Sequence, residues 1–409
     1  MNVVIIGAGP AGITVAETVR SVDHDGTITI VSSEPHPPYS PPALADYFLT
    51  GRSETLFWKG RDVADRLALD YRPGMSVATV DPTNRKVILK DGTVIDYEAL
   101  VVASGSRLHA PITGWDLPGV HDFKSLTTAE ALMGRVRRGE ARTALIVGAG
   151  FIGMEIALLL ADLGVGVTIV GRRGWLMPRM LDQETAAIAE TVMRARGVAI
   201  QLGVEASAFE GAAAVEGVRL ADGTLLTADL YVAATGVKPN IGFLDNSGIL
   251  TGWGITVDEQ LRTSVAGVWA AGDVVEAPDL MTGQRYVHAI FPNALEQGRI
   301  VGANVVGRGL RYAGAESMNS LKHLGLPVMA VGAAEGETEL RWRAGERLRK
   351  IFLSGGRIVG FRFAGEISGG GVLRSLMLRG DDVRRFGRRL VEPGFGEGDL
   401  VLPAISLGL

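Results

Sequence analysis

The chain has 409 residues, of which 47% are hydrophobic and 55 are glycine, and its formal net charge is −4. This length allows two or three domains with a large core, and the glycine content favours a compact α/β protein with many tight turns. The charge gives no global bias towards nucleic acid. There is no cysteine, which excludes a redox-active disulfide, a persulfide intermediate and a Cys-ligated iron–sulfur cluster on this chain.

The first predicted unit is a strand over residues 3–6, a helix over 10–21 and a second strand over 27–31. Between the first strand and the helix stands the G-x-G-x-x-G loop Gly7-Ala8-Gly9-Pro10-Ala11-Gly12. In this context the backbone N–H groups of such a loop and the helix N-terminus bind a dinucleotide pyrophosphate. Glu34 stands near the end of the second strand, where a carboxylate accepts hydrogen bonds from a ribose 2′-OH.

The next segment, 35–42, contains five prolines and should be a rigid loop leading into a helix over 43–49. Alternating segments at 75–81, 85–90 and 94–97 read as strands, and Asp91-Gly92 signals a hairpin between the last two. A buried strand beginning at residue 100 ends in Ala103-Ser104-Gly105.

A second copy of the fingerprint follows in the strand–turn–helix unit over 144–171. Its loop is Gly148-Ala149-Gly150-Phe151-Ile152-Gly153. An antiparallel section over 199–226, with a hairpin at Asp222-Gly223, and a strand ending in Ala234-Thr235-Gly236 complete an internal pseudo-repeat. Two copies in full context predict two dinucleotides bound face to face.

The end of the strand after the second loop indicates which nicotinamide nucleotide is used. Sites that prefer NAD have Glu or Asp there, whereas this chain has Gly171 followed by Arg172 and Arg173. Removing the carboxylate removes repulsion against a 2′-phosphate, and arginine can pair with that phosphate. We therefore predict a preference for NADPH over NADH; the alternative is a pair of ordinary surface arginines.

The last part of the chain contains a strand from Val268 to Asp273, a helix over 293–306, and a change of character near residue 316. Short strands at 328–332, 349–353 and 358–363 and a helix near 371–379 predict a separate α+β domain. Residues 340–409 carry 13 Arg and Lys against 7 Asp and Glu, a net of +6. This region is either a solvated arginine-rich surface or a docking face for an acidic partner. No membrane span is expected, because the most apolar stretch, 144–170, reads as a buried βαβ unit. No nucleic-acid site is expected, because no run of aromatic residues interleaves with the basic residues.

With these motifs in order, the chain resembles the pyridine nucleotide–disulfide oxidoreductase superfamily of two-dinucleotide flavoproteins. The resemblance implies an α/β fold with two Rossmann-like domains, as in glutathione reductase, and a C-terminal α+β domain. It places an FAD-binding domain at 1–113 and 236–315, an NAD(P)H-binding domain at 114–235 and an interface domain at 316–409. The implied FAD-binding residues are Gly7, Gly9, Pro10, Ala11, Gly12, Glu34, Val77, Ser104, Gly105, Gly272, Asp273, Glu296 and Gln297. The implied NAD(P)H-binding residues are Gly148, Gly150, Phe151, Ile152, Gly153, Arg172, Arg173 and Gly236.

The acceptor of the electrons is the open question within this superfamily. Where related disulfide reductases carry cysteine, this chain has Ala43, and the segment 39–51 looks instead like a ferredoxin and rubredoxin reductase motif. Asp46 stands where those reductases have a lysine that pairs with the glutamate matching Glu155, so the usual Lys–Glu geometry is not expected here. Glu155 is the candidate catalytic residue, ordering the nicotinamide or tuning the flavin.

Further similarity joins residues 317–325 to the flavin modules of nitrite reductases and phenylglyoxylate dehydrogenase. His288 and His323 lie in segments expected to approach the flavin, although an ordinary buried or surface histidine is the simpler interpretation of each. The six histidines show no metal-ligand spacing.

We therefore predict a cytoplasmic FAD-dependent NAD(P)H oxidoreductase, monomeric or homodimeric. Its flavin N5 accepts hydride, and the electrons pass to a ferredoxin- or rubredoxin-like protein or an iron–sulfur subunit. One alternative is an NAD(P)H oxidase or quinone reductase. Another is a redox-responsive binding module like apoptosis-inducing factor.

Overall fold

A computed structural model describes residues 1–321, 325 and 327–401, and the chain divides into two compact units. The first unit comprises Met1–His109, Phe123–Met133 and Val237–Glu316. The second comprises Ala110–Asp122, Gly134–Gly236 and the described residues from Ser317 onward. In the part of the chain that the structure describes, no helix has the length and apolar character needed to cross a membrane.

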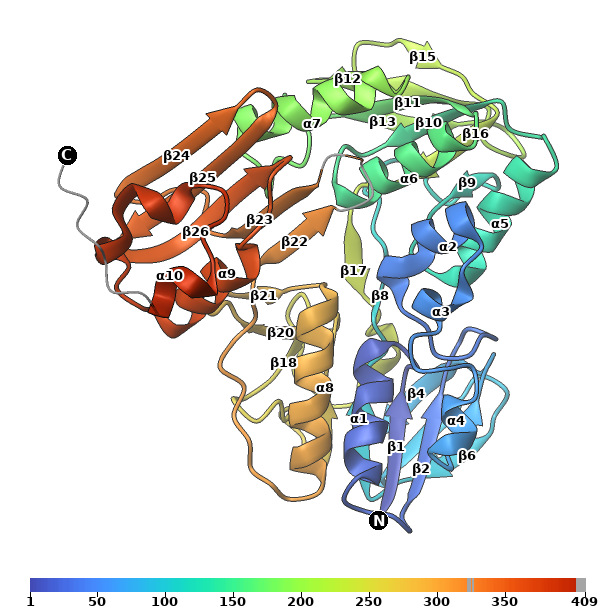
Figure 1. Ribbon diagram of the computed structural model, residues 1–409. Coiled ribbons are helices and arrows are strands. Elements are labelled where there is room, and N and C mark those ends of the chain that lie inside the picture. Colours follow the sequence, from blue (N-terminus) through green and yellow to red (C-terminus); the bar gives the residue numbers. More distant parts are fainter. Residues whose placement is uncertain (322–324, 326, 402–409) are drawn as a thin grey trace. The chain divides into compact units, whose positions relative to one another are not determined.

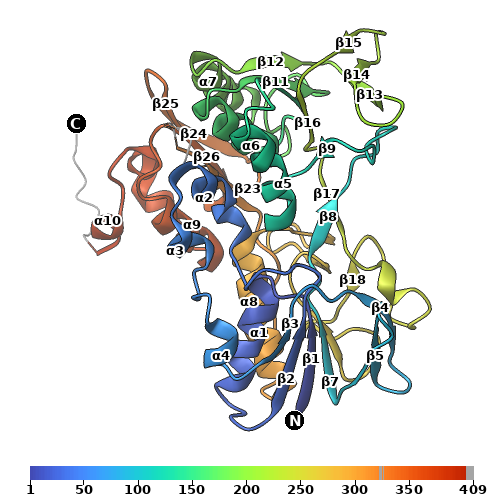
Figure 2. The same cartoon turned by 90° about the vertical axis from the view of Figure 1, so that its right-hand side faces the viewer.

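The first unit is built on a five-stranded parallel sheet in the order β19-β7-β1-β2-β3. Its strands are β1 (Asn2–Ile6), β2 (Thr27–Val31), β3 (Asp70–Arg72), β7 (Ala99–Val102) and β19 (Val268–Ala270). Figure 2 shows β1, β2 and β7 side by side. The central strands are near-continuous runs of buried aliphatic residues, as expected for parallel strands covered on both faces.

Two parallel helices, α1 (Pro10–Arg20) and α8 (Phe291–Val305), pack closely in this unit (Figure 1). Glycines make the close approach possible, because a Cβ on Gly298 would lie 2.7 Å from the Ala11 carbonyl oxygen and one on Gly302 2.9 Å from that of Val15. The helix predicted over 293–306 begins earlier, at Phe291, and Pro292 is tolerated in its first turn.

Shorter elements complete the first unit. The hairpin predicted at Asp91-Gly92 joins two strands of a three-stranded antiparallel sheet, and Gly92 adopts φ +89° at the turn. The small sheets contain β4 (Val77–Asp81), β5 (Lys86–Leu89), β6 (Val94–Asp96), β8 (Ser106–Leu108), β17 (Val237–Pro239), β18 (Ile255–Thr256), β20 (Val275–Pro278) and β21 (Arg285–Val287). The additional helices are α2 (Leu44–Thr50), α3 (Ser53–Leu56), α4 (Val63–Arg66) and the start of α5 (Leu126–Arg137).

The second unit repeats the parallel architecture with the strand order β12-β11-β10-β16-β9. Its strands are β9 (Val120–His121), β10 (Thr143–Val147), β11 (Gly166–Gly171), β12 (Ala199–Leu202) and β16 (Leu230–Ala233). The helices are α6 (Phe151–Asp162) and α7 (Gln183–Ala195). An antiparallel sheet of β13 (Ala206–Glu210), β14 (Gly217–Leu220) and β15 (Leu225–Leu226) forms most of the antiparallel section predicted over 199–226. Its first residues differ from the prediction, because β12 pairs parallel with β11.

The C-terminal residues form a five-stranded antiparallel sheet within the same unit, in the order β22-β23-β26-β25-β24. Its strands are β22 (Met318–Leu321), β23 (Val328–Gly332), β24 (Thr338–Ala344), β25 (Arg347–Ser354) and β26 (Arg357–Ala364). One face packs an apolar core against α9 (Gly370–Arg379) and the 3-10 segment Arg384–Val391, and α10 (Glu397–Val401) follows.

The other face of this sheet carries a row of cations opposite the start of α7. Arg341, Lys350 and Arg362 lie in register on adjacent strands. The Lys350 ammonium contacts the Asp182 carboxylate at 2.9 Å and the Glu184 carboxylate at 2.8 Å, and it is nearly buried. Buried charges require such pairing, so this ion cluster fixes the sheet to the nucleotide-fold part of the second unit.

Candidate functional site

The first glycine loop has the geometry of a dinucleotide cradle. Gly7 adopts φ +110°, and a Cβ there would lie 2.1 Å from the Ala103 carbonyl oxygen. A Cβ on Gly12 would lie 2.0 Å from the Gly7 carbonyl oxygen, so both positions require glycine for packing. Gly9 is different, because nothing lies within 4 Å of the position of its Cβ. The loop is therefore closed on the protein side and open where a ligand phosphate would approach.

Helix α1 starts at this open position without a side-chain cap. Gly9 is its N-cap residue, Pro10 stands in the first turn, and the first helical hydrogen bond runs from the Ile13 amide to the Gly9 carbonyl at 3.0 Å. The amides of Ala11 and Gly12 precede that bond and have no helical acceptor. They are available to an anion, whose charge the helix dipole also favours.

The second glycine loop reproduces this arrangement in the second unit. Gly148 adopts φ +127°, and its Cβ would lie 2.3 Å from the Ala234 carbonyl oxygen; a Cβ on Gly153 would lie 2.0 Å from that of Gly148. Gly150 again has nothing within 4 Å and caps α6, whose first residues are Phe151 and Ile152. The residues of both units thus fit a dinucleotide by the same stereochemical test. Gly236, at φ +149°, also leaves its Cβ position open.

Glu34 lies after the first loop and is held by hydrogen bonds from two sides. Its carboxylate accepts from the Tyr39 hydroxyl at 2.8 Å, and from the amide and hydroxyl of Thr127, both at 3.3 Å. Tyr39 in turn accepts from the Leu126 amide at 2.9 Å, so Glu34 stabilises the start of α5. A carboxylate has about four acceptor positions, so room remains for one ribose hydroxyl.

Asp273 lies three residues beyond β19, because the strand predicted to reach Asp273 ends at Ala270. Contacts from the described residues reach one of its oxygens, Oδ2. The Ser106 hydroxyl donates to its Oδ2 at 2.7 Å, and the Lys124 ammonium contacts the same atom at 3.0 Å. Oδ1 has no hydrogen-bond partner among the residues that the structure describes, which leaves an acceptor for a ligand hydroxyl.

Several other predicted FAD-binding residues have structural partners of their own. The Gln297 carbonyl accepts from the Gly272 amide at 2.7 Å, and its amide donates to the Tyr312 hydroxyl at 3.2 Å. The Ser104 hydroxyl donates to the Asn240 carbonyl at 2.7 Å. These two side chains therefore position the turns that carry Gly272 and Gly105.

The other predicted positions differ in conformation and exposure. Gly105 adopts φ +68° with space around its Cβ position. Glu296 is exposed on α8, and Val77 is half-buried at the start of β4.

The strand end after the second loop has no room for a carboxylate side chain. A Cβ on Gly171 would lie 2.7 Å from the Ala149 Cβ and 3.0 Å from Leu202 Cδ2. Arg172 and Arg173 are both exposed, but they are not equivalent, because Arg172 lies 3.4 Å from the Glu205 carboxylate. The loop after these arginines is fixed to the glycine loop by a hydrogen bond of 2.8 Å from the Met177 amide to the Ala149 carbonyl.

Glu155 lies on α6, one turn after Gly150, and is half-buried. Burial raises the pKa of its carboxyl to about 7. Near physiological pH the protonated and the ionised forms of Glu155 are therefore both populated. In the described residues no hydrogen bond or ion pair involves its side chain. Asp46, in the position of the expected lysine, accepts a hydrogen bond from Thr55 at 3.4 Å within the first unit.

Two histidines, His288 and His323, lie in segments that are expected from the sequence to approach the flavin. His288 is buried beside Asp279, with 2.9 Å between its Nε2 and the carboxylate. His323 lies outside the described residues. No signal in the sequence points to Asp279, nor to the contacts of Tyr39, Thr127 and Lys124, since each depends on residues far apart along the chain.

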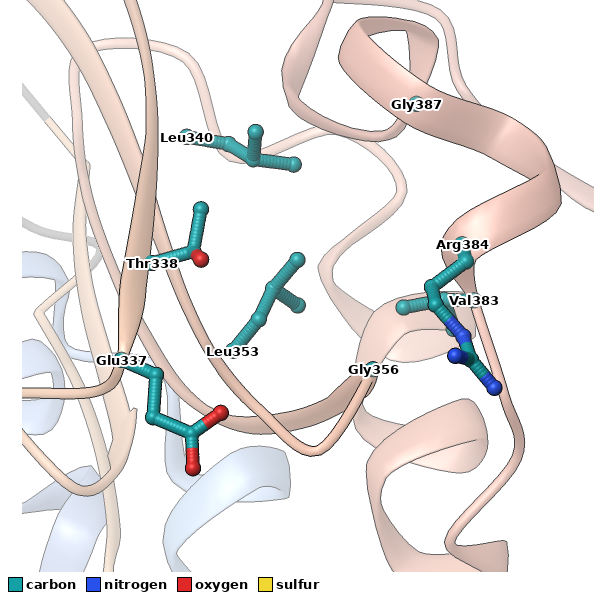
Figure 3. Close-up of a pocket in the computed structure, with 8 residues that line it drawn as sticks. All are labelled: Glu337, Thr338, Leu340, Leu353, Gly356, Val383, Arg384 and Gly387. Atoms are coloured by element: carbon teal, nitrogen blue, oxygen red, sulfur yellow. The ribbon is translucent and has the colours of Figure 1, made fainter.

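A cleft of about 270 Å³ opens in the C-terminal sheet region of the second unit, separate from the glycine loop of that unit (Figure 3). Its lining includes the apolar side chains of Leu340, Leu353 and Val383, with Glu337 and Arg384 among the charged ones. None of the residues predicted to bind a cofactor lines it.

Comparison with known proteins decides the family. Residues 1–298 match the model of the pyridine nucleotide-disulphide oxidoreductase family. The chain belongs to this family. It is an oxidoreductase whose family chemistry uses a flavin and a nicotinamide nucleotide, and the predicted fold class is confirmed.

Three similar proteins illustrate the relationship. The chain is 33% identical over 398 residues to an NADH-dependent phenylglyoxylate dehydrogenase subunit epsilon from Aromatoleum evansii, covering 95% of this chain and 94% of that protein. It is 33% identical over 318 residues to a rhodocoxin reductase from Rhodococcus erythropolis, covering 76% and 74%. A solved ferredoxin reductase for the CYP199A2 system from Rhodopseudomonas palustris superposes with a TM-score of 0.84 at 27% identity, covering 93% and 95%.

Proposed function

We propose that this chain is an FAD-dependent NAD(P)H oxidoreductase that passes electrons to an iron–sulfur protein. The observation that carries the proposal is the pair of glycine loops, each closed on the protein side and open at Gly9 or Gly150. Two such cradles support two dinucleotides and favour hydride transfer between them over a single-cofactor reaction.

We assign FAD to the first unit and NAD(P)H to the second. Ala11 and Gly12 would bind the FAD pyrophosphate, Glu34 its adenosine ribose, and Asp273 Oδ1 a hydroxyl of its ribityl chain. In the second unit the amides at the start of α6 would bind the nicotinamide nucleotide, and Glu155 would act near the nicotinamide. Bound FAD would accept a hydride and give up electrons singly. The protein itself contributes orientation and exclusion of water.

The acceptor is proposed from the absence of cysteine and from the relatives. A chain with no thiol cannot carry a cysteine-based disulfide relay, so the electrons must leave to another molecule. Two similar proteins are named as reductases of rhodocoxin and of a ferredoxin, and a third is a dehydrogenase subunit. We extend this role to the present chain and place it in the cytoplasm.

The basic C-terminal region, residues 340–409, is the proposed docking surface. The ion pairs of its arginines suggest which of them are available to a partner. Some of its arginines are already paired with carboxylates of the same region: Arg384 with Asp382, and Arg389 with Asp399. Arg385 and Arg388 are exposed, and no ion pair of either is found within the described residues. We therefore propose that these two arginines, rather than all four, contact an acidic acceptor.

Charge reversal tests this surface. R385E combined with R388E should slow NAD(P)H-driven reduction of a ferredoxin about tenfold at low salt while leaving ferricyanide reduction unchanged. R384E combined with R389E is the matched control, with a smaller effect expected because those charges are already paired. Equal rates for all variants would contradict the docking surface. Rapid reoxidation of the reduced protein by air, without any partner, would favour an oxidase instead.

The nucleotide preference is also part of the proposal. We infer that NADPH is preferred, because Gly171 leaves no space for a carboxylate and Arg173 is free of the Glu205 contact made by Arg172. The name of the phenylglyoxylate dehydrogenase subunit specifies NADH, so this chain would differ from that relative. The ratio of kcat/KM for the two nucleotides is the direct test.

A further inference from the structure

A buried Asp–His pair in the first unit has no part in the proposed function. Asp279 directly follows β20 and His288 directly follows β21, so the pair links the two strands of a hairpin. His288 is 8% exposed and Asp279 6% exposed, and the Tyr286 ring lies over the imidazole with 3.7 Å between ring centroids. The pair is therefore rigid and shielded from water.

Asp279 is held as a carboxylate. Its Oδ1 accepts hydrogen bonds from the Met281 amide at 3.0 Å, from the Thr282 amide at 2.9 Å and from the Thr282 hydroxyl at 3.1 Å. Burial alone would raise the pKa of Asp279, but these bonds and the bond from His288 outweigh it, and the pKa is lowered.

The carboxylate fixes the tautomer of His288. An ionised Asp279 can only accept a hydrogen bond, so Nε2 carries the proton at their contact of 2.9 Å. In the neutral ring Nδ1 is then an acceptor. This atom is buried and has no hydrogen-bond partner among the described residues. Leaving a buried polar atom without a hydrogen-bond partner costs free energy. Because the bonds of Asp279 hold the His288 ring in one orientation, the unpartnered Nδ1 indicates a donor group of a ligand at this position.

The position of His288 relates this acceptor to the dinucleotide cradle. Two residues after His288, Ile290 is the N-cap of α8 and gives that helix no side-chain cap. The start of α8 borders the start of α1, because the Cβ position of Gly272 lies 3.0 Å from the Ala11 Cβ and 3.9 Å from the Ala294 Cβ. His288 thus approaches the end of the parallel helix pair where the first glycine loop lies.

We propose that His288, held by Asp279, is a further FAD-binding residue of the first unit, and that its Nδ1 accepts a hydrogen bond from an N–H or O–H group of the cofactor. This inference rests on the proposal that the first unit binds FAD. The donor groups of FAD that suit such an acceptor are the imide N–H of the ring and the hydroxyls of the ribityl chain.

Two substitutions separate binding from structure. H288Q places an amide where Nε2 was, which preserves the contact with Asp279 but removes the acceptor at Nδ1. H288N places an amide at the Nδ1 position and loses the contact with Asp279. H121Q is the matched control, because His121 is a half-buried histidine of the second unit whose Nε2 also has no partner within the described residues.

The measurements are the FAD dissociation constant of the reconstituted full-length apoprotein, by flavin fluorescence quenching, and the thermal midpoint of the apoprotein. We expect H288Q to weaken FAD binding at least tenfold with little change in the apoprotein midpoint. H288N should lower the midpoint more and FAD affinity less, and H121Q should leave FAD affinity unchanged.

An N3-methylated FAD distinguishes the two donors. If the loss caused by H288Q disappears with this analogue, the ring imide is the donor; if the loss persists, it is a ribityl hydroxyl. Unchanged FAD affinity in H288Q, or a loss that only follows the apoprotein midpoint, would overturn this inference alone. Failure of the wild-type chain to bind FAD would overturn the proposed function with it.

Discussion

The two glycine loops are alike in backbone geometry but differ in the residues at the end of the next strand. In both loops, the first and third glycines pack against protein carbonyls while the middle one faces open space. Beyond the first loop, Glu34 is held at the strand end by Tyr39 and Thr127. Beyond the second, Gly171 has no room for any side chain and two arginines come next. The backbone geometry of the two glycine loops is thus shared, whereas the residues at the ends of the following strands differ.

Substitution of the middle glycine of each loop, Gly9 or Gly150, should have the largest effect. Each substitution should weaken the binding of one cofactor and leave the other bound. G9A and G150A place a methyl group in the open space of each loop, so the fold should tolerate them while the ligand loses its place. We expect G9A to weaken FAD binding about a hundredfold, and G150A to weaken NADPH binding similarly with FAD retained. Flavin content and nucleotide titrations measure both. G7A is the contrasting variant and should destabilise the fold itself, since its Cβ overlaps the Ala103 carbonyl.

The strand end of the second loop can be rebuilt to resemble the first. G171E alone should destabilise the protein by about 2 kcal/mol, because its Cβ overlaps Ala149. Adding A149G removes the nearest obstacle, and the double variant should recover stability and shift its preference towards NADH. Thermal midpoints and the kcat/KM ratio are the measurements. A single G171E variant as stable as the wild type would contradict the steric explanation.

Glu155 has no acidic counterpart in the first unit, where Thr14 holds the equivalent helix position. The raised pKa of Glu155 predicts that the stability of the protein depends on pH. Its pKa is raised to about 7 by burial, so the folded state holds the proton more tightly than the unfolded state. The associated stability is fully present below the ordinary pKa of a glutamate and is lost as the pH rises to about 7. E155Q should remove this loss and be more stable than the wild type at pH 8, by about 2 kcal/mol. Urea unfolding at pH 5 and pH 8 checks the sign, and a larger deficit of E155Q at pH 8 would refute it.

The two arginines after Gly171 should contribute unequally. R173A should raise the KM for NADPH about tenfold and leave the KM for NADH nearly unchanged. R172A should have the smaller effect, because Arg172 already faces Glu205. Equal effects on both nucleotides would show that the arginines do not read the 2′-phosphate.

The smallest expected effect is at the ribose end of the first loop. Y39F removes the hydroxyl that links Glu34 to the Leu126 amide and should cost about 1 kcal/mol in FAD binding. Isothermal titration of the apoprotein measures this, with T127V as a second variant on the same carboxylate. If neither variant changes FAD affinity, Glu34 does not act at the ribose.

The features that the sequence predicts well are local. Each glycine loop, the strand before it and the helix after it depend on residues within one short segment, as do the hairpins at Gly92 and Gly223, which both adopt φ +89°. Strand β24 is missing from the strands predicted in the C-terminal region, although Leu340 and Trp342 alternate there with charged residues, as in a half-buried strand. The Lys124–Asp273 and Tyr39–Leu126 contacts join distant residues, which no local pattern encodes.

One anaerobic titration tests the central claim that the two loops bind two different cofactors and that the strand ends select them. The FAD-loaded protein would be mixed with NADPH and with NADH in a stopped-flow spectrophotometer while the visible flavin band is followed. We predict that both nucleotides bleach the band and that NADPH does so faster. A flavin that neither nucleotide reduces, or faster reduction by NADH, would contradict this claim.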